Sequence, residues 1–172
     1  AAFNKDGFEL FNNRTYVFLG DGCMQEGVAS EAASMAGHLG LKNLIAFYDD
    51  NHITIDGDTN CAFTEDVGKR FESYNWNVLT VKNGDEDLSA LWDAIVKAQQ
   101  EKERPTLVCV QTTIGFGSLN QGKASVHGAP LKEDDIAQLK TKFGFNPEEK
   151  FVVPHDVRDA YKSYADRGAA KH

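Results

Sequence analysis

The chain has 172 residues, which is long enough for one sizeable hydrophobic core and for no more than one typical domain. Its net charge of −8, without any Lys/Arg run, argues against a nucleic-acid partner. No apolar run has transmembrane length and no signal peptide opens the chain, so we expect no membrane association. The cysteines Cys23, Cys61 and Cys109 are odd in number and widely spaced. They argue against zinc and a disulfide framework, and suit a reducing compartment.

Apolar runs and helical periodicities alternate along the chain. Short β-branched and aromatic runs predict strands at residues 15–19, 43–48, 76–81 and 106–113. Apolar residues at helical spacing predict helices at 27–39, 65–74, 87–102, 133–143 and 156–167. A brief alternating run at 53–55 ends in the turn signal Asp56-Gly57. The alternation predicts an α/β fold with a doubly wound, mostly parallel sheet and helices on both faces.

Two polar segments follow the first two predicted strands. The first strand ends in Gly20-Asp21-Gly22, and the second ends in Asp49-Asp50-Asn51. A right-handed strand–helix–strand unit places the carboxyl ends of both strands at one edge of the sheet, where open α/β sheets bind ligands. Asp21 and Asn51 should therefore meet there.

A carboxylate and an amide oxygen suit Mg²⁺, which takes its remaining ligands from water or phosphate. The glycines beside Asp21 allow close approach of a ligand, and the free N–H groups of the helix after Gly27 favour an anion. These residues predict a magnesium-bridged phosphate or diphosphate. The simpler interpretations are a plain Gly-Asp-Gly turn and a solvated acidic corner at Asp49-Asp50.

Gly20-Asp21-Gly22, followed about thirty residues later by Asn51, resembles the thiamine-diphosphate fingerprint. The segments YVFLGDGCMQEG, YDDNHITIDG, TTIGFGS, SVHGAPL and KFGFNPEEKFVVP are similar to the transketolase family in its fungal form, and the likeness covers nearly the whole chain. The resemblance implies Mg²⁺ ligands from the Asp21 and Asn51 side chains and the Ile53 backbone carbonyl, with Ca²⁺ or another divalent cation as a substitute. It also implies thiamine diphosphate as cofactor and Gly22 as a contact to it.

The long glycine-bearing segment 114–130 predicts a functional loop that contains His127. A lone loop histidine is usually a surface residue, but this one should follow a strand's carboxyl end at the predicted site. The resemblance implies that His127 contacts the cofactor diphosphate and the sugar substrate and acts in catalysis. It places Glu26 in an acid network near a subunit interface, whereas the simpler interpretation is an acid at a helix N-terminus. Ile53 and Ile114 are candidates to pack on the cofactor, with ordinary core burial as the alternative for Ile114.

The activity implied is transfer of a two-carbon ketol unit from a ketose phosphate to an aldose phosphate, in the pentose phosphate pathway. The resemblance further implies a cytoplasmic homodimer, of which residues 1–172 would be part of the diphosphate-binding (PP) domain. Since the chain opens without Met and the family carries further segments, we expect a piece of a larger multi-domain enzyme that is inactive alone.

Two other functions stay open. Dihydroxyacetone synthase, a peroxisomal relative that uses formaldehyde as acceptor, shares these motifs. A Mg²⁺-binding phospho-receiver module would suit Asp49-Asp50, but it requires a phosphorylated Asp on a later strand and a partnering Lys, and leaves Asp21 and His127 unexplained.

Overall fold

The computed structural model describes residues 3–171. The chain divides into two compact units, of which the first ends at Pro130 and the second begins at Leu131. The first unit contains the sheet and all the predicted site residues, and the second consists of helical and irregular segments. Each unit is described separately.

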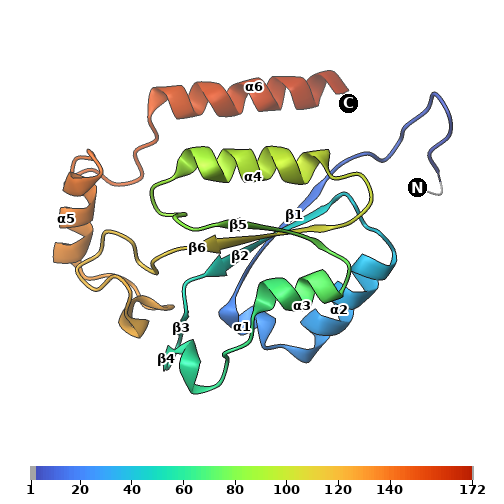
Figure 1. The fold of residues 1–172 in the computed structure, drawn as a ribbon. Coiled ribbons are helices and arrows are strands. Elements are labelled where there is room, and N and C mark those ends of the chain that lie inside the picture. The colour runs from blue at the N-terminus through green and yellow to red at the C-terminus, as the bar shows by residue number, and fades with distance from the viewer. Residues whose placement is uncertain (1–2, 172) are drawn as a thin grey trace. The chain divides into compact units, whose positions relative to one another are not determined.

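The first unit is built on a four-stranded sheet in the order β1-β2-β6-β5 (Figure 1). All three neighbouring pairs are parallel, as the α/β prediction requires. The strands are β1 (Thr15–Gly20), β2 (Leu44–Asp50), β5 (Asn77–Val81) and β6 (Thr106–Gln111). The central strands β2 and β6 are almost continuously apolar and buried, which is typical of a parallel sheet covered on both faces.

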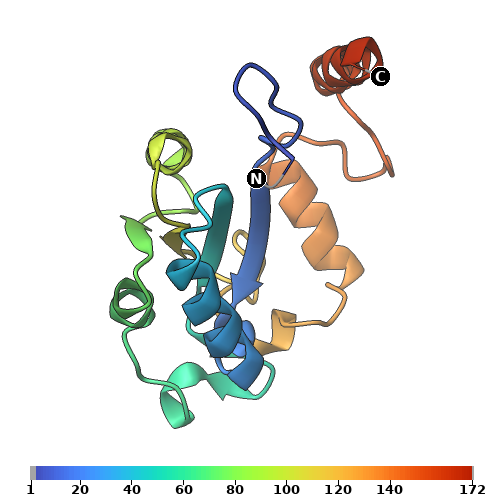
Figure 2. The ribbon, with the colours of Figure 1, turned by 90° about the vertical axis from the view of Figure 1, so that its right-hand side faces the viewer.

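Helices cover both faces of this sheet (Figure 2). The helices α2 (Gly27–His38) and α3 (Val67–Ser73) pack on one face, in a core that includes Ala33, Phe71 and Trp76. The helix α4 (Leu88–Gln100) packs on the other face through Ala94 and Ala98. The prediction of a doubly wound sheet is confirmed.

Local capping fixes where two of these helices begin. The Asp66 carboxylate accepts the Lys69 N–H at 3.0 Å, so α3 begins at Val67 and not at Glu65 as the periodicity predicted. The Asp87 carboxylate accepts the Ala90 N–H at 2.9 Å and starts α4 in the same way. The N-cap residue of both helices is therefore Asp, one of the residue types favoured at that position.

The sequence analysis missed the short α-helix that follows β1. The turn α1 (Asp21–Met24) follows β1 directly, before α2 begins at Gly27. The apolar periodicity begins only after Gly27, and a four-residue helix is too short to produce a period of its own. As a result, Asp21 and Gly22 lie in a helical turn and not in a loop.

A close contact between α2 and the end of α3 makes Gly37 essential to packing. A Cβ at this position would lie 1.7 Å from the Tyr74 carbonyl oxygen, and the neighbouring Trp76 indole donates to the Ala33 carbonyl at 2.8 Å. The backbone contact leaves no room for a methyl group, so Gly37→Ala has to move the helix.

We expect Gly37→Ala to lower the free energy of unfolding by about 3 kcal/mol, at the upper end for overpacking. Gly27→Ala is the matched control, because it lies in the same helix and a Cβ there has no heavy atom of the neighbouring structure within 4 Å. Urea unfolding of both variants is the measurement. Equal urea midpoints for the two variants would show that the contact of residue 37 with the Tyr74 carbonyl does not determine stability.

The second unit contains α5 (Glu133–Lys142) and α6 (His155–Lys171). The helix α5 has acids in its first turn and Lys140 and Lys142 in its last, the arrangement that the helix dipole favours. The helix α6 is longer than the predicted range 156–167. Within residues 3–171, every helix is too short or too polar to cross a bilayer.

Candidate functional site

The candidate site lies at the carboxyl edge of the sheet. β1 and β2 are adjacent and parallel, with Gly20 opposite Asp49 in the register. Asp21 follows the end of β1 and Asn51 follows the end of β2, so the fold brings both residues to the same edge. Beyond Asn51 the chain forms the hairpin of β3 (Ile53–Thr54) and β4 (Gly57–Asp58), which extends from this edge (Figure 1).

A cavity of about 890 Å³ opens at this edge. All the residues that the sequence analysis selected as site residues line it, together with Ile114 and the β3–β4 hairpin. The selected residues are Asp21, Gly22, Glu26, Asn51, Ile53 and His127. The structure therefore brings together groups that are spread over more than half of the chain.

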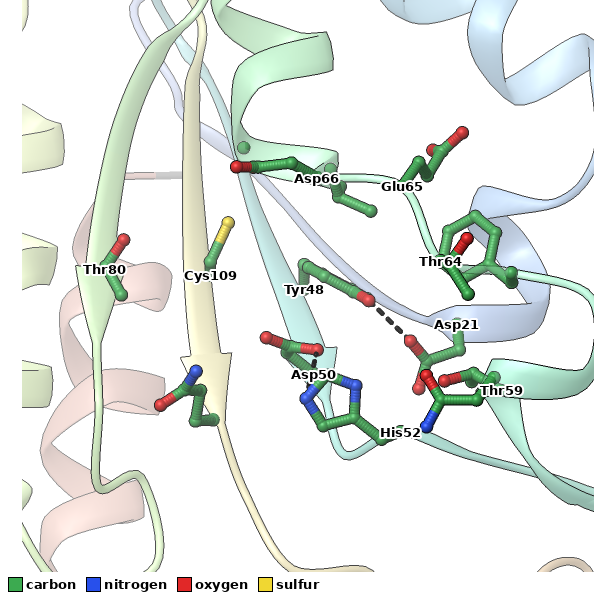
Figure 3. A pocket seen from close by; sticks show the side chains of 15 residues that line it. Asp21, Tyr48, Asp50, His52, Thr59, Thr64, Glu65, Asp66, Thr80 and Cys109 are labelled. Carbon is green, nitrogen blue, oxygen red and sulfur yellow. Dashed lines mark hydrogen bonds and ion pairs between the residues drawn. The ribbon is translucent and has the colours of Figure 1, made fainter.

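Asp21 is the buried acid of the site, only 3% exposed. Its Oδ1 accepts a hydrogen bond of 2.5 Å from the Tyr48 hydroxyl, which Figure 3 shows pointing at the carboxylate. Its Oδ2 is also buried, and no described residue donates to it. Burial raises the pKa of the Asp21 carboxyl group. A buried carboxylate oxygen without a donor is costly, and a bound cation would remove that cost.

Asn51 is held by hydrogen bonds on both sides of its amide. Its Nδ2 donates to Asp49 Oδ2 at 3.0 Å, and its Oδ1 accepts the Ile53 N–H at 3.0 Å. The hydroxyl of Thr112 donates to the other Asp49 oxygen. His52 adopts a left-handed φ of 60° inside this turn, which reverses the chain toward Ile53. Asp49 is therefore a partner of Asn51 and not only a solvated acid.

The approach to Asp21 is open on the glycine side. A Cβ built on Gly20 or Gly22 meets no heavy atom within 4 Å. Gly22 lines the cavity, so its backbone is accessible to a ligand there. Glu26 is the N-cap residue of α2, with an exposed side chain that makes no capping hydrogen bond.

A folded loop brings His127 to the cavity. The loop turns at Gly115, where φ is +64° and a Cβ would lie 2.8 Å from the Val126 side chain. The Gly122 N–H donates to the Ile114 carbonyl at 2.8 Å, which closes the loop on itself. A single 3₁₀ turn, η2 (Ala124–Val126), then places His127, which is exposed to solvent, beside the carboxyl edge.

The charge of the cavity decides which ligands fit. His127 is the only basic side chain among the lining residues, whereas five carboxylates line the cavity. These acids are Asp21, Glu26, Asp49, Asp56 and Asp58. A bare diphosphate would be repelled here, but a divalent cation reverses the local sign. The buried Asp21 Oδ2 and the Asn51 amide oxygen are the hard ligands that such a cation takes. The residues present fit a cation-bridged diphosphate.

A second cavity of about 360 Å³ shares Asp21 and Thr59 with the first (Figure 3). It contains the Tyr48 side chain, and an Asp50–His52 pair whose closest atoms are 3.6 Å apart. Burial raises the pKa of the Cys109 thiol to about 12, so this thiol is inert at neutral pH. Tyr48 therefore meets Asp21 in the smaller cavity and does not line the larger one.

The family described as "Transketolase, thiamine diphosphate binding domain" matches residues 1–172. The chain belongs to the transketolase family. It is 65% identical over 161 residues, 94% of this chain, to a transketolase from Kluyveromyces lactis, and covers 24% of that protein. It is 44% identical to a dihydroxyacetone synthase from Pichia angusta, over 98% of this chain and 24% of the relative. A phospho-receiver module is not supported by these matches.

Transketolase structures share the fold described above. A transketolase from Pichia stipitis in complex with sedoheptulose-7-phosphate superposes with a TM-score of 0.93 at 56% identity, over 98% of this chain and 25% of that one. The chain thus spans about a quarter of the length of the transketolases that it matches. These matches confirm the fungal transketolase resemblance and the predicted fold.

The sequence analysis did not select Tyr48, Asp49 or Thr112, although each contacts a predicted ligand or its partner. Tyr48 falls inside an apolar strand run and was assigned to that strand. The alternation of side chains along a strand was the available signal. Tyr48 and Asp49 are consecutive at the end of a strand, so their side chains point to opposite faces of the sheet. Thr112 lies on a different strand end and gave no local signal.

Proposed function

We propose that the protein containing this segment is a transketolase that depends on thiamine diphosphate and Mg²⁺. It would transfer a two-carbon ketol unit from a ketose phosphate to an aldose phosphate. The observation that carries the proposal is the acidic cavity that Asp21, Asn51 and His127 line together. The buried Asp21 Oδ2 there accepts no hydrogen bond from the described residues.

The segment's own residues would bind and orient the cofactor diphosphate. Asp21, Asn51 and the Ile53 carbonyl would hold Mg²⁺, and the exposed backbone of Gly22 would meet a phosphate oxygen. When bound, thiamine diphosphate supplies the carbanion stabilisation that breaking a carbon–carbon bond requires. The buried Asp21 and the hydrogen-bonded Asn51 are fixed before the ligand arrives, which is the preorganisation that a cation site needs.

His127 would serve both the cofactor and the substrate. Its imidazole can donate to a phosphate oxygen and can move a proton near neutral pH. Its exposed position at the mouth of the cavity supports a contact with an incoming sugar phosphate. Glu26, also exposed at the cavity, would belong to an acid network at the interface of a homodimer.

We place this segment in the diphosphate-binding domain of a larger, cytoplasmic enzyme. The chain's span of about a quarter of its relatives supports the larger size, as does the apolar surface of the edge strand β1, where Phe18 is 81% exposed. Residues outside the segment would cover that surface. The segment alone would then bind cofactor weakly and catalyse no ketol transfer.

Dihydroxyacetone synthase is the second candidate, favoured by the 44% identical relative of that name. It would use formaldehyde as the acceptor and would be peroxisomal. Because these residues would bind the cofactor diphosphate in either enzyme, the acceptor that is used in an assay distinguishes the two.

The test is calorimetry of the full-length protein with thiamine diphosphate, with and without Mg²⁺, followed by ketol transfer to ribose 5-phosphate and to formaldehyde. We expect cofactor binding that requires Mg²⁺ and preferential transfer to the sugar phosphate. Preference for formaldehyde would select the synthase. Cofactor binding of equal affinity after chelation of divalent cations would contradict the proposed metal site.

A further inference from the structure

The hydrogen bond between Tyr48 and Asp21 fixes the orientation of the Asp21 carboxylate. Both side chains are 3% exposed, and the hydroxyl donates to one carboxylate oxygen only. The other oxygen, Asp21 Oδ2, is left buried and without a donor among the described residues. An asymmetric arrangement of this kind reserves one oxygen and fixes the rotation of the carboxylate.

The position of Tyr48 explains how it reaches Asp21. In the sheet register Tyr48 lies opposite Leu19 of β1 on one side and Cys109 of β6 on the other. Its ring belongs to the core cluster that includes Phe71 of α3, and its hydroxyl points at Asp21, the first residue of α1 (Figure 3).

We propose that Tyr48 is a positioning residue for the divalent cation: it holds Asp21 Oδ1 so that Oδ2 faces the cation in one fixed orientation. The inference rests on the proposed function, because it assumes that Asp21 is a cation ligand. Tyr48 itself does not touch the cation or the substrate.

Fixed orientation matters more for Mg²⁺ than for Ca²⁺. Mg²⁺ requires nearly ideal octahedral geometry, whereas Ca²⁺ accepts irregular and flexible ligand sets. A carboxylate that is free to rotate should therefore lose more affinity for Mg²⁺ than for Ca²⁺. The ratio of the Mg²⁺ affinity to the Ca²⁺ affinity therefore reports on the positioning of the carboxylate. A general loss of folded structure would lower both affinities by the same factor.

The experiment compares Tyr48→Phe with the wild type in the full-length protein. The affinities for Mg²⁺ and for Ca²⁺ are each measured by calorimetry in the presence of saturating thiamine diphosphate. We expect Tyr48→Phe to weaken Mg²⁺ binding by about 10- to 100-fold, the usual effect of removing an outer-shell partner, and to weaken Ca²⁺ binding less.

Tyr16→Phe is the matched control. Tyr16 lies on β1 of the same sheet, and its hydroxyl accepts a 2.7 Å hydrogen bond from the Gln99 side chain of α4. Its side chain is absent from the lining of both cavities. This variant should leave both affinities unchanged.

The outcomes separate the inference from the function on which it rests. A wild-type protein that binds Mg²⁺, with a Tyr48→Phe variant of unchanged Mg²⁺ affinity, overturns the inference alone. An equal loss for Mg²⁺ and Ca²⁺ also overturns it, since that would indicate a structural role. A wild-type protein that binds neither cation with the cofactor overturns the proposed function and the inference together.

Discussion

Replacing Asp21 with alanine is expected to abolish Mg²⁺-dependent binding of thiamine diphosphate and to reduce ketol transfer by at least about 100-fold. Asp21 supplies the only buried carboxylate among the residues lining the larger cavity, and its Oδ2 is the oxygen that a cation would take. Losing an outer-shell partner of a metal already costs about 10- to 100-fold, and a direct ligand should cost more. Calorimetry of the full-length variant and a ketol transfer assay are the measurements.

Asp56→Ala is the control for this experiment, because Asp56 lines the same cavity but is exposed. Its removal takes away one negative charge and no proposed ligand, so metal and cofactor affinity should stay near those of the wild type. If the two variants lost the same affinity, the effect would reflect the summed charge of the acidic lining. Asp21 would then have no special place as a ligand.

The sequence was sufficient for the sheet because its strands are buried in long apolar runs and its helices are amphipathic. The run Leu44–Tyr48 and the run Thr106–Val110 are almost fully buried in the structure, which is why both were visible as strands. Capping was harder to locate. The start of α3 depended on which of two consecutive acids, Glu65 or Asp66, accepts the backbone N–H, and periodicity does not distinguish them.

The site was predictable to the extent that topology alone places it. Parallel strands β1 and β2 have to end at one edge, so the meeting of Asp21 and Asn51 followed from the crossover rule. The path of the loop to His127 did not follow, since it depends on the packing of Gly115 against Val126. Nor did the contact of Tyr48 with Asp21, because a tyrosine in an apolar run reads as core until its hydroxyl is seen to have a partner.

Replacing His127 with alanine should reduce the turnover of the full-length enzyme by about 100- to 10,000-fold, the range for a residue that transfers protons in catalysis. The free energy of unfolding should hardly change, because the side chain is exposed and the loop is closed by backbone hydrogen bonds and by Gly115 and Val126. Steady-state ketol transfer and urea unfolding of the same preparation would measure both quantities. A diphosphate contact would appear separately, as weaker binding of thiamine diphosphate in calorimetry.

The control for His127 is His38→Ala, which removes an exposed histidine at the end of α2 that lines neither cavity. It should keep the turnover of the wild type. The kinetic pattern of His127→Ala then separates its two proposed roles. A raised KM with unchanged kcat would assign the imidazole to substrate binding only, whereas a lowered kcat at saturating cofactor requires that it act in the chemical steps. Turnover equal to that of the wild type at every substrate concentration would remove His127 from the site, and its place at the cavity mouth would then be that of an ordinary surface residue.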